Sequence, residues 1–335
     1  MEAILKTLTT FLQTVPGALI LLVVGFVLLV KGADFFVDGA SNVAKRLRIP
    51  AMIIGLTIVA MGTSLPETAV SISASMQGSN SLAISNVTGS NLFNLMVVVG
   101  LCAIMQTIAV EKETIQRDIP ISLAAAVLML IFSWTDGTVN RLEGGILLIL
   151  FAGYIILMIR SALKARNGET IKPGTDEEEV VTQTVLVSLI CIVGGACGIA
   201  LGGDWVVDAA STLAIKFGMT ETLVGLTIVA VGTSLPELVT SIVAARKNEV
   251  EMALGNAIGS NVFNILMVIG IAGLISPINL VETLMNNVLD IVVLLASTII
   301  VWLMVFKSKK LTRSTGIFMV LVYVAYMAYI IIRDM

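Results

Sequence analysis

Two copies of the hexapeptide GTSLPE, at residues 62–67 and 232–237, place polar chemistry inside apolar runs. Within a helix, Pro66 has no N–H to donate to the carbonyl of Gly62, and its ring presses against the same carbonyl. The helix must therefore open at this point. Carbonyl groups freed around residues 60–62 are tolerable at membrane depth only where something inside the protein satisfies them, and a cation is one candidate.

Each copy also supplies side-chain oxygen atoms in a regular pattern. Thr63 and Ser64 carry hydroxyl groups, and Glu67 places a carboxylate one turn after Thr63 on the same helix face. Ser90 and Asn94 form an i,i+4 pair that can line the side of such a site. The matching residues of the second copy are Thr233, Ser234, Pro236, Glu237, Ser260 and Asn264.

All of these ligands are oxygen atoms, which favours a hard cation such as Ca²⁺ or Na⁺ over Zn²⁺ or Cu²⁺. Glu67 and Glu237 would be costly inside a membrane without a partner, and neither copy has a Lys or Arg nearby. A divalent cation would neutralise both. The alternative is a proline kink beside a protonated, hydrogen-bonded glutamic acid, and the matched second copy weighs against it. The sequence contains no histidine, which excludes His-based triads and His-ligated zinc sites.

The composition is that of an integral membrane protein, because 57% of the residues are hydrophobic, 13% are charged and the mean hydropathy is +1.01. Apolar runs of about 20 residues mark candidate spanning helices. The first run continues without a small-residue cleavage pattern, so it is interpreted as a span and not as a signal peptide. Ten spans are predicted, near residues 17–43, 50–76, 81–107, 119–134, 143–163, 184–210, 220–245, 250–275, 286–306 and 314–332.

The basic residues predict the orientation of these spans. With ten spans both termini share one side, and the opposite side collects fifteen of the twenty Lys and Arg residues. The positive-inside rule assigns that richer side to the cytoplasm, so both termini face outward across the plasma or inner membrane. The longest loop, residues 164–183, is then a solvated cytoplasmic linker that is too short to fold as a domain. Its acidic run, Asp176–Glu179, has a regulatory cation site as an alternative role.

The sequence is also duplicated. Residues 55–74 match residues 225–244 at fifteen of twenty positions, with a shift of 170. Five spans lie in each half, residues 1–163 and 184–335, and an odd number forces the second half to enter the membrane from the opposite side. The predicted fold is therefore an all-α membrane protein of two inverted five-helix repeats, with broken helices and a substrate site at the midplane. The same shift relates Asp34 to Asp204, Asp38 to Asp208, Asn86 to Asn256, and the segment 89–94 to 259–264.

Other polar residues are less specific. The four repeated aspartates could line ion entrances or form hydrogen bonds at the water-facing halves of the first and sixth spans. Lys31 is expected to pair with Asp34, three residues on, and not to bind substrate. Cys102, Cys191 and Cys197 lack metal-ligand or redox spacing and are expected to be small buried hydrophobes.

The doubled GTSLPE motif, followed in each half by GSNLFN or GSNVFN, resembles the Ca²⁺:cation antiporter superfamily, most closely the prokaryotic sodium/calcium exchangers. The resemblance extends over essentially the whole chain. It implies exchange of Ca²⁺ for Na⁺, or a proton-coupled variant, through four adjacent sites. It also implies that the first and sixth helices slide over a fixed core.

The resemblance further assigns residues to these sites. Asn264 occupies a position where some relatives have aspartate. The formal charge of the site is therefore −2, from Glu67 and Glu237. The amide also removes a carboxylate that could titrate or bind K⁺, which argues mildly against K⁺ dependence. The implied Ca²⁺ ligands are Glu67, Glu237, Thr63 and Thr233. The implied Na⁺ ligands are the Ala230 carbonyl, Ser234 and Ser260 on one side, and the Ala60 carbonyl, Ser64 and Ser90 on the other, with Asn94 and Asn264 flanking the middle.

The leading hypothesis is a secondary antiporter that moves Ca²⁺ outward against an inward Na⁺ flux. One alternative keeps the fold but couples Ca²⁺ to H⁺, and a more remote one is a cation channel lined by carboxylates and carbonyls. An intramembrane enzyme is disfavoured, because no Asp dyad motif or nucleophile–base pair is present. The expected partners are the transported ions and membrane lipid, with no cofactor and no nucleic acid, and the expected functional unit is a monomer.

Overall fold

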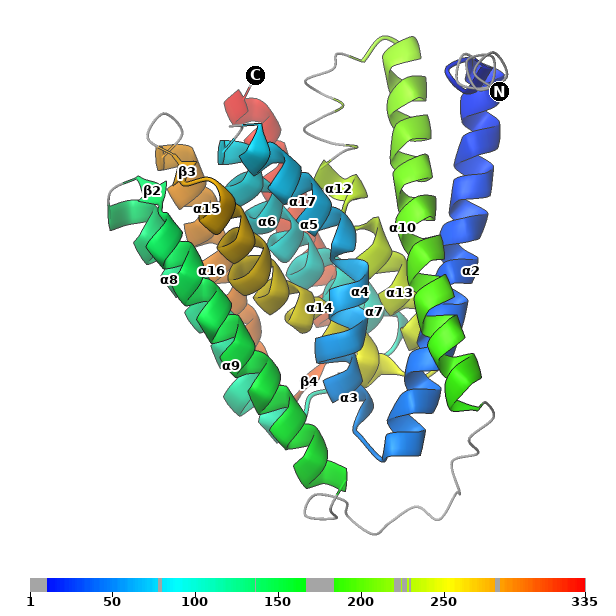
Figure 1. Cartoon of the computed structure of the whole chain (residues 1–335), viewed down its shortest axis with the longest axis vertical. Helices are drawn as coiled ribbons and strands as arrows, with labels where there is room; N and C mark the ends of the chain where they lie inside the picture. The colour runs from blue at the N-terminus through cyan, green and yellow to red at the C-terminus, as the bar shows by residue number, and fades with distance from the viewer. Residues whose placement is uncertain are drawn as a thin grey trace.

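The computed structural model describes residues 11–77, 80–135, 137–166, 184–219, 224, 228, 230–280 and 284–334. Over these ranges the chain is almost entirely helical, and Figure 1 shows the helices running roughly side by side along the long dimension of the molecule. The uninterrupted long helices are α2 (Val15–Leu47), α9 (Arg141–Arg166), α10 (Val185–Lys216), α16 (Leu284–Ser308) and α17 (Arg313–Asp334).

The remaining spanning segments are interrupted. One segment is bent by 48° between residues 63 and 65. It consists of α3 (Ala51–Ile54), η1 (Gly55–Val59), α4 (Ala60–Thr63) and α5 (Leu65–Met76). Three other segments each contain a wide turn of π-helix. The first consists of α6 (Asn80–Phe93), η2 (Asn94–Val98) and α7 (Val99–Met105), and the second of η3 (Thr114–Asp118) and α8 (Ile119–Thr135). The third consists of α14 (Val250–Phe263), η5 (Asn264–Ile269) and α15 (Gly270–Ile275).

Within the described residues, eight helices are long and apolar enough to cross a membrane, and the bent segment makes a ninth. Each overlaps one of the predicted spans. The predicted span at 220–245 lies partly outside the described residues, which include α12 (Ala230–Gly232) and α13 (Leu235–Arg246) of it. Nine of the ten predicted spans are thus accounted for, and the full ten-helix layout stays a prediction.

The helices α2 and α10 form a close antiparallel pair at one side of the molecule (Figure 1). Glycines make this approach possible, because an added Cβ at Gly32 would lie 2.7 Å from the backbone nitrogen of Ile199. The same contact continues as Gly25 against Gly202 and Gly39 against Ser188. Residues of increasing number along α2 therefore contact residues of decreasing number along α10, as an antiparallel helix pair requires.

This packing gives a first testable prediction. Gly32→Ala should lower the melting temperature of the purified protein, because the backbones must separate to admit the methyl group, at a cost of roughly 1–3 kcal/mol. Gly194→Ala is the matched control, since a Cβ at Gly194 meets nothing within 4 Å. Equal melting temperatures for the two variants would contradict this close packing.

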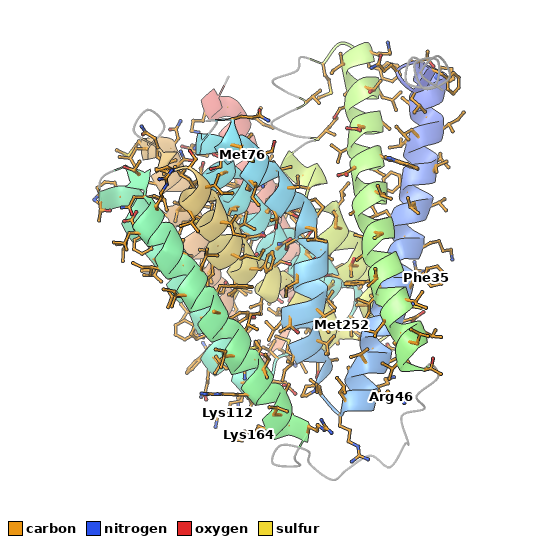
Figure 2. All side chains as sticks on the ribbon, viewed as in Figure 1. Phe35, Arg46, Met76, Lys112, Lys164 and Met252 are labelled. Atoms are coloured by element: carbon orange, nitrogen blue, oxygen red, sulfur yellow. The ribbon has the colours of Figure 1, made fainter. Side chains whose placement is uncertain are left out.

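A second glycine contact brings the two halves together beside the bent segment. An added Cβ at Gly255 would lie 2.5 Å from the carbonyl oxygen of Met52, and one at Gly55 would lie 2.5 Å from that of Met252. Met252 is fully buried and lies in the middle of the lower half of the view in Figure 2. The helical segment that leads into the first GTSLPE motif is therefore held directly against α14.

Two short strand pairs join loops that are distant in the sequence. Strand β1 (Ile108–Ala109) pairs with β4 (Lys310–Leu311), and β2 (Thr138–Val139) pairs with β3 (Ile278–Asn279), both antiparallel. In Figure 1, β2 and β3 lie at one end of the helices, while β4 lies toward the other end.

The expectation for the cysteines is only partly right. Cys102 is buried in α7, but Cys191 is half-buried and Cys197 is exposed on α10. The error arises because α10 packs chiefly along its glycine face and leaves the rest of its circumference uncovered. An apolar sequence run does not distinguish a lipid-facing side chain from a buried one.

Candidate cation-binding site

The first GTSLPE motif opens its helix as the proline predicts. The helix α4 ends at Thr63 and α5 begins at Leu65, with Pro66 in the first turn, where a missing N–H is harmless. The Ala60 carbonyl, which was expected to be freed, accepts a hydrogen bond from the N–H of Ser64 at 3.1 Å. That expectation was wrong, because Ser64 lies before the proline and keeps its own N–H.

The helix is interrupted at the matching place in the second motif. The N–H of Ser234 donates to the Val231 carbonyl at 3.2 Å, and α13 begins at Leu235 with Pro236 in its first turn. The side chain of Ala230 lies outside the described residues. Two helix breaks of the same kind thus present the same set of oxygen-bearing residues from different parts of the chain.

The serine of each motif bonds the glutamate of the other motif. Ser64 Oγ donates to Glu237 Oε1 at 2.9 Å, and Ser234 Oγ donates to Glu67 Oε1 at 3.3 Å. Ser260 Oγ also lies 3.5 Å from Glu237 Oε1. Both carboxylates are completely buried. The two motifs, 170 residues apart, therefore form a single polar centre.

This centre has buried oxygen atoms without a partner. The second carboxylate oxygen of Glu67 and that of Glu237 receive no hydrogen bond, and neither does the side-chain oxygen of Asn94 or Asn264. Leaving such groups unsatisfied is expensive, so they point to a ligand that supplies positive charge. Among the described residues no cluster of three His, Cys, Asp or Glu occurs. The donor set is therefore two carboxylates with neutral oxygens, which suits Ca²⁺ or Na⁺.

The threonines of the two motifs face asparagines of the opposite half. Thr63 Oγ1 lies 3.0 Å from Asn256 Oδ1, and Thr233 Oγ1 lies 3.5 Å from Asn86 Oδ1. Each hydroxyl has one hydrogen to donate and keeps lone pairs for another ligand. Both threonines are buried, and their role as oxygen ligands of a cation stays a prediction.

The amide groups of these asparagines hold the glutamate-bearing helices in place. Asn86 Nδ2 donates to Ser71 Oγ at 3.0 Å and lies 3.4 Å from the Glu67 carbonyl. Asn256 Nδ2 does the same with Ser241 Oγ at 2.9 Å and the Glu237 carbonyl at 3.3 Å. The repeat relates Asn86 to Asn256, but no role for them was predicted from the sequence. Each asparagine lies 19 residues after the glutamate of its half, Asn86 after Glu67 and Asn256 after Glu237, and this equal spacing could have indicated a shared role.

Reciprocal hydrogen bonds between asparagine residues join α6 to α14. Asn91 Nδ2 donates to the Asn261 carbonyl at 3.1 Å, and Asn261 Nδ2 donates to the Asn91 carbonyl at 3.0 Å. Asn264 Nδ2 then donates to Asn91 Oδ1 at 3.1 Å, whereas neither amide atom of Asn94 has a partner. The two flanking asparagines are thus both buried but are not equivalent.

The crossed serines give a second prediction. Ser64→Ala or Ser234→Ala should weaken Ca²⁺ transport about tenfold, because each removes a hydrogen bond to a charged group and one candidate oxygen ligand. Ser73→Ala is the control, since Ser73 is exposed on α5 and bonds only the Gln77 side chain. Initial rates of Ca²⁺ uptake into proteoliposomes measure the effect, and unchanged rates for both motif variants would contradict it.

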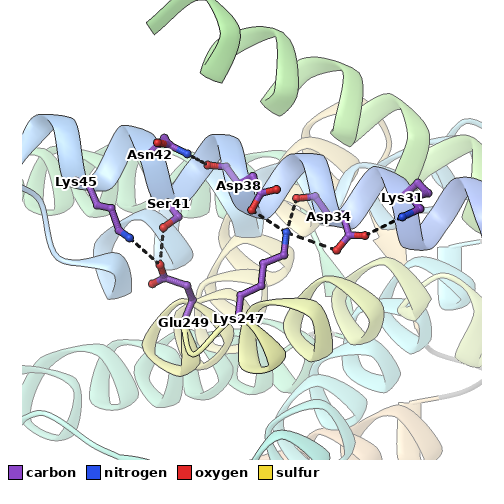
Figure 3. Close-up of polar contacts among 8 residues, drawn as sticks. All are labelled: Lys31, Asp34, Asp38, Ser41, Asn42, Lys45, Lys247 and Glu249. Carbon is purple, nitrogen blue, oxygen red and sulfur yellow. Dashed lines mark hydrogen bonds and ion pairs between the residues drawn. The ribbon is translucent and has the colours of Figure 1, made fainter. Parts of the chain in front are cut away.

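The repeated aspartates lie outside this centre. Lys31 Nζ lies 3.6 Å from Asp34 Oδ2, which confirms the predicted pair. Asp34 and Asp38 also face Lys247 from the α13–α14 turn (Figure 3). Asp204 and Asp208 are exposed on α10. These four residues therefore contribute no ligand to the buried centre in this arrangement.

Comparison with known proteins identifies the family. The family model described as "Sodium/calcium exchanger protein" matches residues 17–160 and 187–332, which is most of the chain. The chain belongs to the sodium/calcium exchanger protein family. Its membership makes this protein a transmembrane antiporter, and the resemblance drawn from the doubled motif is confirmed.

Several known proteins match more than three quarters of this chain. Sodium/calcium exchanger MaX1 of Methanosarcina acetivorans is 32% identical, with 92% of this chain and 97% of the relative covered. Inner membrane protein YrbG of Escherichia coli is 37% identical, with 77% and 79% covered. A structure of the sodium-calcium exchanger NCX_Mj, soaked with Na⁺ and Sr²⁺, superposes with a TM-score of 0.79 at 31% identity and covers 94% of this chain and 99% of that one.

Proposed function

We propose that this exchanger moves one Ca²⁺ in one direction and Na⁺ in the other, using the centre built by the two GTSLPE motifs. The observation that carries the proposal is the crossed pair of buried glutamates, each with one carboxylate oxygen bonded to a serine and the other without a partner. Glu67, Glu237, Thr63 and Thr233 would bind Ca²⁺.

The charge of the centre supports a divalent cation. Two carboxylates at membrane depth need compensation, and one Ca²⁺ supplies all of it. Na⁺ would occupy the flanking oxygen groups when Ca²⁺ leaves. One flank is the Ala60 carbonyl with Ser64 and Ser90, and the other is the Ala230 carbonyl with Ser234 and Ser260, while Asn94 and Asn264 line the middle.

Alternating access fits the proposed inverted repeat. Strand β1 corresponds to β3 under the shift of 170, and β2 corresponds to β4 under a shift of 172. The two strand pairs are then equivalent, and their placement toward opposite ends of the helices is what an inverted repeat requires. The antiparallel pair of α2 and α10, the first helix of each half, agrees with the same arrangement.

The orientation is proposed from the basic residues. Figure 2 shows Arg46, Lys112 and Lys164 together at one end of the molecule and Met76 at the opposite end. The basic end would face the cytoplasm, with both termini outside the plasma or inner membrane. We further propose that the chain acts as a monomer, with no enzymatic activity and no cofactor.

A proton-coupled Ca²⁺ antiporter is the second candidate. The unpartnered carboxylate oxygens of Glu67 and Glu237 are compatible with it as well, since a proton on each would neutralise the same carboxylates that Ca²⁺ would bind. Channel activity is the more remote alternative, and saturable flux that depends on a counter-ion would exclude it.

The test is Ca²⁺ uptake by proteoliposomes that contain the purified protein, under an outward Na⁺ gradient, an outward H⁺ gradient or neither. Uptake driven by Na⁺ alone is expected. Uptake driven by H⁺ alone would move the protein to the proton-coupled alternative, and uptake that needs neither gradient would contradict antiport.

A further inference from the structure

Lys247 joins α2 to the turn between α13 and α14. Its Nζ lies 2.7 Å from Asp38 Oδ1, 3.5 Å from Asp34 Oδ1 and 3.1 Å from the Asp34 carbonyl oxygen. Figure 3 shows the lysine reaching up from the turn between the two aspartates. The ammonium group thus compensates one of the two negative charges on this stretch of α2, and Lys31 also pairs with Asp34.

A second contact from the same turn reinforces the first. Glu249 accepts a hydrogen bond from Ser41 and lies 3.9 Å from Lys45 Nζ. Between the two charged residues, Asn248 adopts a left-handed conformation with φ of 63°, so the turn is tight and presents both side chains to α2. Both contacts join parts of the chain more than 200 residues apart.

The turn and the held stretch of α2 are both linked to the buried centre. Lys247 directly follows α13, which carries Glu237. On α2, Phe36 lies between the two aspartates, and its ring would be 2.6 Å from a Cβ added at Gly62, the first residue of the first motif. Because a helix moves as a rigid rod, fixing residues 34 and 38 also fixes this ring over the motif.

Among the described residues, α10 has no contact equivalent to this one. The residue that matches Lys247 under the shift of 170 is Gln77, whose amide donates to Ser73 on its own helix at 3.0 Å. Among the residues that the structure describes, no ion pair reaches Asp204 or Asp208. Within the described residues the two sides of the repeat therefore differ, because ion pairs tie α2 to the core and none ties α10.

We propose that Lys247 is a positioning residue that forms an ionic latch with Asp34 and Asp38, and that this latch holds α2 closed over the first motif. Opening of this side of the centre requires the lysine to leave the aspartates, whereas no ion pair among the described residues restrains α10. The latch rests on the proposed alternating access. On the proposed orientation it lies toward the cytoplasm, so it favours the conformation that is closed on that side.

The test measures how readily α2 leaves the core, without any transport step. Ala40 is fully buried on α2, and Ala40→Cys is introduced after the three native cysteines are changed to alanine. In detergent, Lys247→Gln should raise the rate at which a water-soluble maleimide labels this cysteine by about 1.5- to 5-fold, the range expected for exposed ion pairs. The charge-swapped double variant Lys247→Asp with Asp38→Lys should return the rate toward that of the parent.

Ala209→Cys on α10 is the matched control, because Ala209 is equally buried but belongs to the half without a latch. Its labelling rate should not change when Lys247 is replaced. An unchanged rate at residue 40, or an equal rise at both positions with a lower melting temperature, would overturn the latch. Neither result depends on which ions the protein carries, so failure of the latch is distinguishable from failure of the proposed function.

Discussion

Replacing either Glu67 or Glu237 by glutamine should lower Na⁺-driven Ca²⁺ uptake by at least about 100-fold. Each carboxylate is completely buried, and in the proposed site each would supply half of the charge that compensates the divalent cation. The glutamine has nearly the same shape, but it removes one negative charge and turns an acceptor into a donor. The measurement is the initial rate of Ca²⁺ uptake into proteoliposomes, at matched protein content.

The control for this experiment is Glu113→Gln, which makes the same chemical change at an exposed position. It should leave the uptake rate unchanged. Melting temperatures of the two buried variants should show that they still fold. Near-normal exchange by folded Glu67→Gln or Glu237→Gln protein would mean that the transport site lies elsewhere.

Replacing Asn264 by aspartate should keep Ca²⁺ transport but make it depend more steeply on pH or on monovalent ions. The amide of Asn264 donates to Asn91 Oδ1 at 3.1 Å, and a carboxylate has no hydrogen for that bond unless it is protonated. The variant would also make the formal charge of the centre more negative, from −2 to −3. Binding of a proton or of an additional monovalent cation then becomes favourable.

Asn94→Asp is the informative comparison, because Asn94 is equally buried but its amide has no partner to lose. It adds the same charge without breaking the bond to Asn91. Uptake should be measured across pH and across Na⁺ and K⁺ concentration for both variants. If neither profile differs from that of the unmodified protein, these two positions do not tune the coupling.

The breaks in the helices could be predicted from the sequence, but the pairing between them could not. Proline chemistry places the opening at Pro66 because it is local. The bond from Ser64 to Glu237 depends on how α4 and α13 pack, and no short-range pattern encodes that. The repeat did predict that both motifs would meet, since a midplane site between inverted halves needs both.

The wide π-helical turns were also missed. The turns η2 and η5 begin at Asn94 and Asn264, the two flanking asparagines. A third, η1, has the carbonyl of Leu56 accepting a hydrogen bond from Tyr154 Oη at 3.2 Å. Such turns are stabilised by tertiary partners and have no distinct hydropathy pattern, so apolar periodicity predicts an ordinary helix there.

One span boundary illustrates how charges mislead the prediction. The span predicted at 119–134 begins at Thr114 in the structure. Arg117 and Asp118 interrupt the apolar run with charges, but Arg117 Nε lies 2.6 Å from Asp118 Oδ1 and Nη1 donates to Ser161 at 2.7 Å. Paired charges can extend a helix that isolated charges would end.

In the proposed mechanism Ca²⁺ and Na⁺ compete for one centre built by the two motifs. Calorimetric titration of Ca²⁺ into the purified protein tests this competition most directly. In Na⁺-free buffer we expect saturable binding of one Ca²⁺ per chain, with an apparent affinity that falls steadily as Na⁺ is added. Glu237→Gln should show no such binding. Ca²⁺ binding that is indifferent to Na⁺, or that persists unchanged in Glu237→Gln, would contradict the account.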